Sequence, residues 1–172
     1  TNLPAVCHVL HKQGVDLDVV DQPEDLEDAS ALILPWSGPL EAGCKILADT
    51  GLGDAIVEAV AAGRPLLGLS GGAYLLAETL PSGDAGLGLL PGSVTLHEPR
   101  ATIGWAALRV RSDDVVLSEV PDGAHVFLLG RYRLVLDDTT RPAVLGALDQ
   151  PAVPAVIRRG HVVGTLFELH AT

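Results

Sequence analysis

The sequence predicts an α/β fold, because short buried strands and helices alternate along its first half. Residues 31–35 and 65–69 are continuous apolar runs, which are typical of parallel strands that are covered on both faces. Helical patterns over 39–48 and 53–62 separate these runs. After residue 92 the segments become short and rich in β-branched residues. We therefore expect a parallel α/β half followed by an antiparallel region.

The N-terminal segment is predicted to contain one more helix and one more strand. An apolar stripe from Leu3 to Leu10 predicts a helix, which Thr1 or Asn2 can cap. Residues 15–20, with the sequence VDLDVV, alternate between apolar and acidic side chains as a half-buried strand does. Both elements would precede the buried run at 31–35.

The second half is predicted to be a loop followed by strands. Residues 81–92 are rich in Gly and Pro and predict a loop. Arg159-Gly160 lies where a hairpin turn is expected, and Trp105 is expected to pack in the core. The expected strands are 93–98, 105–111, 125–136, 143–147, 152–158 and 161–167. No linker, repeat or low-complexity tract interrupts the chain, so we expect a single domain over residues 1–172.

The composition narrows the classes of partner. The net charge of −11 repels nucleic acid and anionic membrane surfaces, so neither is an expected partner. No apolar run reaches the length of about 18 residues that a membrane helix needs, and no basic, apolar leader opens the chain. The two cysteines, Cys7 and Cys44, lie in no metal-binding motif. We expect a cytoplasmic protein without a metal or another cofactor.

Residues 68–72, with the sequence GLSGG, match the G-x-S-x-G nucleophile elbow. Such a strand-to-helix turn projects the serine from the sheet, and the helix N-terminus offers N–H groups to an oxyanion. A serine nucleophile needs a base, and His170 is the best placed because Glu168 lies on the same side two residues earlier. The other histidines considered as bases are His97, His125 and His161.

Several segments, in the same order, resemble the class I glutamine amidotransferase family. Within that family they are most similar to the glutaminase subunits of imidazole glycerol phosphate synthase, which belong to histidine biosynthesis. The similarity extends over nearly the whole chain. The segments are TNL (1–3), PEDLEDASALILP (23–35), GLGLLPG (86–92), IGW (103–105), VPDGAHVFLL (120–129) and AVIRRGHVVGTLFELH (155–170).

The resemblance implies a class I glutamine amidotransferase-like (flavodoxin-like) mixed sheet with helices on both faces and a small antiparallel region. It also implies a Cys-His-Glu triad that hydrolyses glutamine to glutamate and ammonia, and a heterodimer with a cyclase-type (βα)8-barrel subunit that receives the ammonia. The family's first strand would precede Thr1 and is expected to be missing: a segment before Thr1 is absent, another segment or chain pairs in its place, or the sheet has closed up, and we favour the first of these. Its absence would leave two unpaired edges inside the core.

The chain departs from the family pattern at the triad. Ser70 stands where the family has its cysteine, and Glu168 and His170 have exchanged the places of the family's histidine and glutamate. Two residues along a strand span about 6.6 Å, whereas proton transfer needs about 2.6–3.2 Å between heavy atoms. We therefore expect Glu168 to face Ser70 and His170 to stand behind it.

The family's oxyanion strand and glutamine pocket are altered as well. The oxyanion and substrate-pocket positions are Trp36, Ser37, Gly38, Gly71, Gly72, Tyr74, Gly130, Arg131 and Tyr132. Bulky Trp36 replaces a glycine, and Tyr74 replaces the glutamine that helps to hold the substrate, which puts glutamine binding in question.

These changes predict a glutaminase-like subunit that no longer hydrolyses glutamine and acts as a structural or regulatory partner of a cyclase-type subunit. Two alternatives stay open. The chain could be a serine acyl-hydrolase that uses Ser70 and His170, or a still-active glutamine amidotransferase subunit.

Overall fold

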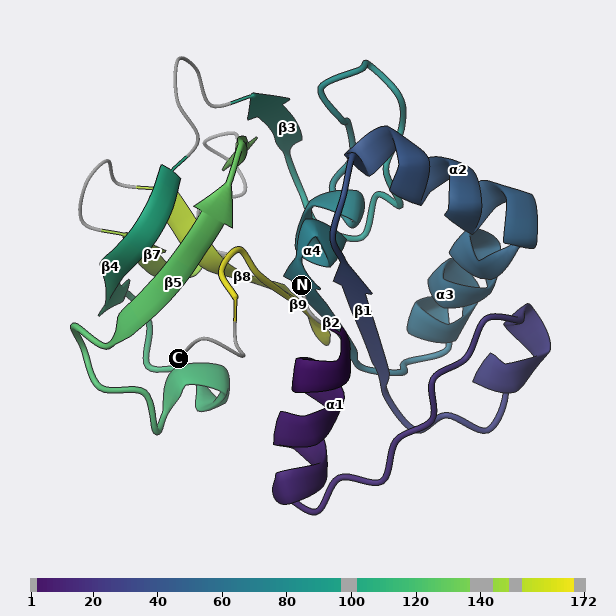
Figure 1. Ribbon diagram of the computed structural model, residues 1–172, viewed down its shortest axis with the longest axis horizontal. Helices are drawn as coiled ribbons and strands as arrows, with labels where there is room; N and C mark the ends of the chain where they lie inside the picture. The colour runs from purple at the N-terminus through teal and green to yellow at the C-terminus, as the bar shows by residue number, and fades with distance from the viewer. Residues whose placement is uncertain (1–2, 97–101, 137–143, 149–152, 169–172) are drawn as a thin grey trace.

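The computed structural model describes residues 3–96, 102–136, 144–148 and 153–168 (Figure 1). The helices are α1 (Leu3–Lys12), α2 (Leu40–Thr50), α3 (Leu52–Ala61) and α4 (Gly71–Leu75), with 3-10 turns η1 (Pro23–Leu26) and η2 (Val115–Leu117). The strands are β1 (Leu32–Trp36), β2 (Leu66–Ser70), β3 (Ser93–Leu96), β4 (Thr102–Val110), β5 (His125–Gly130), β6 (Tyr132–Val135), β7 (Val144–Leu148), β8 (Val153–Arg159) and β9 (Val162–Thr165). The caps expected at Thr1 or Asn2 lie outside the described residues.

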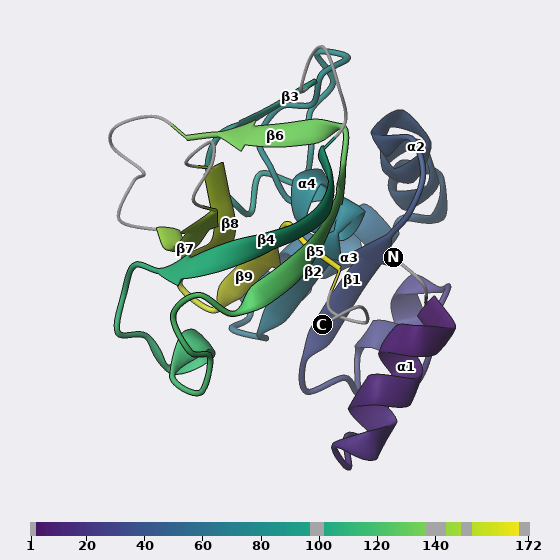
Figure 2. The same cartoon turned by 60° about the vertical axis from the view of Figure 1, so that its left-hand side comes forward.

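Seven of the strands form one mixed sheet in the order β1-β2-β9-β8-β7-β4-β5. The pairs β1–β2 and β2–β9 are parallel, whereas every later pair in this order is antiparallel. Strands β3 and β6 form a separate antiparallel pair. The expected mixed α/β fold, with a parallel first part and an antiparallel second part, is therefore confirmed. Figure 2 shows how strongly the sheet curls between its two parts.

The predicted strand at 15–20 does not form. This segment has no regular structure, and Val15 and Val19 are 43% and 66% exposed. Strand β1 forms the end of the sheet, and among the described residues only β2 pairs with it. The missing first strand was expected to leave two unpaired strand edges inside the core. This was also wrong, because the unpaired edge of β1 lies at the border of the sheet. Residues 15–20 pair with no strand among the described residues, so they form no ladder.

The long strand predicted over 125–136 is two strands. It is interrupted at Arg131, and its first part, β5, joins the large sheet while its second part, β6, pairs with β3. The predicted hairpin turn after Arg159 is confirmed, because Gly160 adopts a φ of 61° and Arg159 pairs with Val162.

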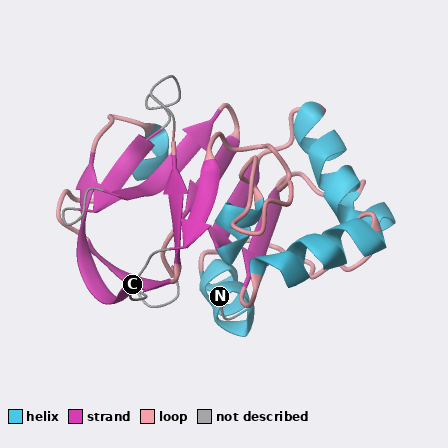
Figure 3. Ribbon diagram, turned by 90° about the horizontal axis from the view of Figure 1, so that it is seen from above, coloured by secondary structure: helices cyan, strands magenta, loops and turns pink. Residues whose placement is uncertain are grey.

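The helices gather mostly over the parallel end of the sheet (Figure 3). In α2 the residues Leu40, Gly43 and Leu47 are buried, which is the spacing of one helix face. Helices α2 and α3 pack against each other, and α4 packs on β1 and β2. These contacts hold the turn between β2 and α4 in the interior.

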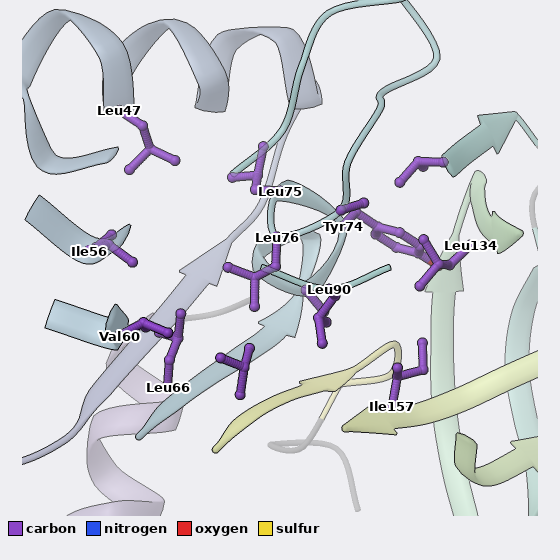
Figure 4. Close-up of a cluster of buried hydrophobic side chains, with 14 of the residues drawn as sticks. Leu47, Ile56, Val60, Leu66, Tyr74, Leu75, Leu76, Leu90, Leu134 and Ile157 are labelled. Atoms are coloured by element: carbon purple, nitrogen blue, oxygen red, sulfur yellow. The ribbon is translucent and has the colours of Figure 1, made fainter. Parts of the chain in front are cut away.

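Two hydrophobic clusters lie on the sheet. The larger joins α2, α3 and α4 to β2 and includes Leu66, Leu76 and Leu90 (Figure 4). The smaller lies among the antiparallel strands and includes Leu108 and Phe167. Trp105 belongs to neither core, contrary to expectation, because it is 58% exposed with its ring edge-on to Phe127.

The segment predicted as a loop after α4 is a loop, and it is closely packed. The backbone N–H groups of Leu87, Leu89 and Leu90 donate to the carbonyls of Leu75 and Leu76 at distances of 2.8–2.9 Å. These bonds satisfy carbonyls at the C-terminus of α4, which a helix end leaves without partners. The loop therefore holds α4 in place at its C-terminus.

Candidate functional site

Ser70 occupies a sharp turn between β2 and α4. Its φ of 52° and ψ of −113° make it the only described non-glycine residue with a positive φ. A side chain at such angles is strained, and strain of this kind is a feature of G-x-S-x-G turns. The strand-turn-helix context that the motif requires is present.

Glycines on both sides of Ser70 allow close contact between the strands and α4. A Cβ atom on Gly72 would lie 1.8 Å from the Leu34 carbonyl oxygen, and one on Gly71 would lie 2.6 Å from the Trp36 carbonyl oxygen. A Cβ atom on Gly68 would lie 2.8 Å from the Ala73 Cα atom. Helix α4 can therefore lie directly on β1 and β2 only with glycine at these positions.

Glu168 reaches Ser70 from the end of the neighbouring strand. The Ser70 Oγ atom donates a hydrogen bond to Glu168 Oε1 at 2.6 Å. Both residues are buried, with 9% and 3% of their surfaces exposed. The Glu168 backbone N–H donates to the Phe127 carbonyl at 2.9 Å, so β5 also positions this residue. The expected contact between Glu168 and Ser70 is present.

None of the described histidines is hydrogen-bonded to Ser70. The His161 Nε2 atom lies 2.8 Å from the Val60 carbonyl oxygen, and its position before β9 is at the opposite end of the strands from Ser70. His125 is exposed on β5. His97 and His170 lie outside the described residues.

Trp36 ends β1 directly beside Ser70. The two residues are partners in the parallel register of β1 and β2. The Trp36 Nε1 atom donates to the Pro39 carbonyl at 3.1 Å. Ser37 and Gly38 follow in an exposed loop, where Gly38 has a φ of 133°.

Tyr74 and Tyr132 lie together. The Tyr74 hydroxyl donates to the Tyr132 carbonyl at 2.9 Å, and the ring centroids are 5.7 Å apart. Tyr74 is 6% exposed and belongs to the larger hydrophobic cluster (Figure 4), and burial raises the pKa of its phenol. Gly130 is half-buried at the end of β5, and Arg131 is exposed. The resemblance assigns this position to a substrate-binding side chain, but here Tyr74 packs in the hydrophobic core instead.

The site brings together the buried hydroxyl of Ser70, the carboxyl group of Glu168 and the indole of Trp36. Over residues 3–96, 102–136, 144–148 and 153–168, no three His, Cys, Asp or Glu side chains are placed to hold a metal ion. A hollow of about 420 Å³ lies elsewhere, lined by Arg111, Asp114 and Asp122 among others, and no predicted site residue lines it. None of the described helices is long and apolar enough to cross a membrane.

Sequence reasoning missed two contributors to the site. Phe127 supports Glu168 through a backbone bridge, which has no signature in the sequence because any residue offers a carbonyl. Gly43 of α2 faces Trp36, since a Cβ atom there would lie 2.9 Å from the Trp36 Cε2 atom. A glycine inside a predicted helix is a signal of close packing that could have been used.

Known proteins with similar sequences and structures share this architecture. Residues 7–116 match the CobB/CobQ-like glutamine amidotransferase domain. The chain is 34% identical to "Imidazole glycerol phosphate synthase subunit HisH" of Geobacillus sp. (strain WCH70), over 96% of this chain and 83% of that protein. It is 32% identical to the HisH subunit of Microcystis aeruginosa, over 96% of this chain and 82% of that protein.

Solved structures agree on the fold. One titled "Crystal structure of glutamine amidotransferase" matches with a TM-score of 0.80 and 22% identity, over 100% of this chain and 87% of that one. "Structure of PurLQS from Thermotoga maritima" matches with a TM-score of 0.76 and 17% identity, over 97% of this chain and 81% of that one. The matched domain and the relatives at 32–34% identity show that the chain belongs to the class I glutamine amidotransferase family, among the HisH-type subunits.

Proposed function

We propose that this chain is the amidotransferase-type subunit of an imidazole glycerol phosphate synthase and that it does not hydrolyse glutamine. In this role it binds a cyclase-type (βα)8-barrel subunit in the cytoplasm, as a structural or regulatory component, and free ammonia supplies the nitrogen. The relatives named as subunits of that synthase, matched along 96% of the chain, support the partner.

The observation that carries the loss of hydrolysis is the 2.6 Å hydrogen bond from Ser70 Oγ to Glu168 Oε1. A serine attacks an acyl group only if a base takes its proton during the reaction. Carboxylates are far weaker bases than the alkoxide that would form, and an efficient general base is matched to the working pH. The partner that Ser70 has in the structure is therefore a poor proton acceptor for this step.

A carboxylate at this position also opposes the charge that develops during hydrolysis. The oxyanion of a tetrahedral intermediate is stabilised by nearby N–H donors and destabilised by a nearby negative charge. Glu168 is 3% exposed, and water screens a negative charge weakly at a position this buried. Loss of triad members costs several orders of magnitude in related chemistry, and we expect a loss of about 10⁴-fold or more.

Hydrolysis is tested by measuring glutamate release from glutamine in the presence of the barrel subunit encoded in the same genome. We expect no release above that of the Ser70→Ala variant, while the Geobacillus relative with its own barrel subunit serves as the active control. Glutamate release that disappears in Ser70→Ala would restore the active amidotransferase.

Partner binding is tested separately by isothermal titration of the same barrel subunit into this chain. Binding at micromolar concentration or tighter is expected, since subunits of a stable complex bury large surfaces. Absence of binding at about 10 µM would remove the partner from the proposal.

The serine acyl-hydrolase alternative is tested with a fluorophosphonate probe, which labels activated serines. The strained backbone of Ser70 favours this candidate, because it is the geometry of working nucleophile elbows. We expect no labelling of Ser70 in the folded chain, and labelling that Ser70→Ala abolishes would support the hydrolase instead.

A further inference from the structure

We propose that Trp36 determines access to Ser70: its indole closes the turn between β2 and α4 to acyl substrates. This inference rests on the proposed loss of glutamine hydrolysis. It identifies a side chain that contributes to the loss by keeping acyl substrates away from Ser70. This exclusion is independent of Glu168, which is a poor acceptor for the Ser70 proton and opposes the negative charge of the oxyanion.

Trp36 is the residue beside Ser70 on the neighbouring strand. In the parallel register of β1 and β2 the two are direct partners. Paired residues on neighbouring strands lie about 5 Å apart, so Trp36 stands directly beside the turn, and its indole lies toward Gly43 of α2 and Gly71 of α4.

Contacts on three sides define where the indole lies. A Cβ atom on Gly71 would lie 2.9 Å from Trp36 Cδ1, one on Gly43 would lie 2.9 Å from Cε2, and one on Gly38 would lie 3.7 Å from Cζ2. The ring is therefore placed between the start of α4, the first turns of α2 and the loop after β1. Glycine at positions 43 and 71 provides the room that the indole takes up.

Gly71 is the residue that matters for an acyl substrate. In G-x-S-x-G turns, the backbone N–H of the residue after the serine forms part of the oxyanion hole. The Trp36 carbonyl oxygen and Cδ1 atom both lie within 3 Å of the position a Gly71 Cβ would take, so this residue is covered from the β1 side. An acyl group that approached Gly71 from the β1 side would have to displace the indole.

The indole is held in place. Its Nε1 atom donates to the Pro39 carbonyl at 3.1 Å, which fixes the ring orientation within the loop. Ser70 is 9% exposed beside it. The turn is thus covered by a large side chain with a defined hydrogen bond.

The test measures how fast a thiol at position 70 reacts. Ser70→Cys and the double variant Trp36→Gly/Ser70→Cys are treated with iodoacetamide, and alkylation of the peptide that contains position 70 is followed by mass spectrometry. We expect at least a tenfold faster reaction in the double variant. Rates are compared at their plateau at high pH, where the thiol is ionised in both.

The matched control removes the other tryptophan. Trp105 is 58% exposed on β4, so Trp105→Gly/Ser70→Cys should react as slowly as Ser70→Cys. Cys7 and Cys44 report general loosening, because their alkylation should be unchanged in all variants. Circular dichroism establishes that each variant is folded.

Equal rates at the introduced thiol with and without Trp36 would overturn the proposal, as would acceleration shared by Cys44 and by the Trp105 control. If Trp36→Gly does not fold, Trp36→Phe replaces it: the smaller ring lacks Nε1, and an intermediate acceleration is expected, whereas an unchanged rate contradicts the proposal. The assay contains neither glutamine nor barrel subunit. Its outcome is therefore separate from the tests of hydrolysis and of partner binding.

Discussion

Gly72 shows, at the scale of one residue, how closely α4 lies on the sheet. A Cβ atom there would lie 1.8 Å from the Leu34 carbonyl oxygen, which is backbone and cannot move aside like a side chain. We expect Gly72→Ala to lower the free energy of unfolding by about 3 kcal/mol or more, measured by urea denaturation.

Gly53→Ala is the matched control. Gly53 also lies in a helix and is buried, but a Cβ atom there would make contacts at 3.4 Å or more. Its replacement by alanine should leave stability unchanged or raise it by up to about 1 kcal/mol, because alanine favours the helix. Similar losses in both variants would mean that α4 is not held by the contact at Gly72.

Tyr74 predicts a specific dependence of stability on alkaline pH. Burial raises the pKa of its phenol above the ordinary value of 10.0. Below that value the phenol is neutral in both states, whereas above it the unfolded chain loses the proton first, so stability falls as the pH rises toward the folded pKa. The fall is at most about 1.4 kcal/mol per pH unit.

At neutral pH, Tyr74→Phe should lower the free energy of unfolding by about 1 kcal/mol, because the hydrogen bond to the Tyr132 carbonyl is lost. Above about pH 10, the stability of this variant should fall less steeply than that of the native chain. Urea denaturation between about pH 7 and about pH 11 measures both. Tyr132→Phe, which replaces the chain's other tyrosine, should keep the full decline. Parallel pH profiles for the native chain and Tyr74→Phe would contradict the prediction.

The residues of the site could be predicted only where the sequence determines them locally or where the family resemblance places them. The G-x-S-x-G spacing places Ser70 in its turn, whereas the contact with Glu168 was predicted from the family resemblance, in which that position holds the histidine of the triad. The burial of Tyr74 and the exposure of Trp105 could not be read in this way. Both depend on which distant strands lie opposite, and that is set by the tertiary fold.

At the scale of elements, the loop after α4 is part of the core. Leu90 is fully buried, and a Cβ atom on Gly164 of β9 would lie 2.6 Å from its Cδ1 atom. Leu90→Ala should therefore lower the free energy of unfolding by about 2–5 kcal/mol, measured by urea denaturation. Leu89→Ala, half-buried in the same loop, should cost less than half as much. Equal, small losses would show a loosely attached loop.

Elements were predicted well where their own pattern determines them. The apolar runs at 31–35 and 65–69 form β1 and β2, but β1 is not buried on both faces as expected, because it lies at the border of the sheet and Ile33 is 37% exposed. Residues 15–20 have an equally clear alternation and form no strand, because side-chain alternation alone does not supply the backbone pairing with a neighbouring strand that a ladder needs. The division of 125–136 at Arg131 was hidden because both parts have strand-like composition.

At the scale of the whole molecule, the parallel and antiparallel parts share one continuous sheet with β9 at their junction. Strand β9 pairs in parallel with β2 on one side and antiparallel with β8 on the other. Ser70 ends β2 and Glu168 follows β9, so their contact lies where the two parts meet. A family resemblance predicted this architecture, whereas the position of the free edge depends on which strand the tertiary fold leaves at the border.

The border formed by β1 has a consequence for behaviour at high concentration. Its sequence LILPW is apolar, Ile33 is 37% exposed, and its outer side has no strand partner among the described residues. Exposed strands of this kind template intermolecular ladders, and a charged side chain suppresses them. Ile33→Lys should therefore raise the concentration at which light scattering detects aggregates, by about threefold or more.

Ile46→Lys adds the same charge on the surface of α2, where Ile46 is 48% exposed, and should change aggregation much less. Equal protection by both lysines would assign the effect to net charge. If only Ile33→Lys protects, aggregation of this chain starts at the unpaired edge of β1. Its solubility at high concentration then depends on whether another segment or molecule covers that edge.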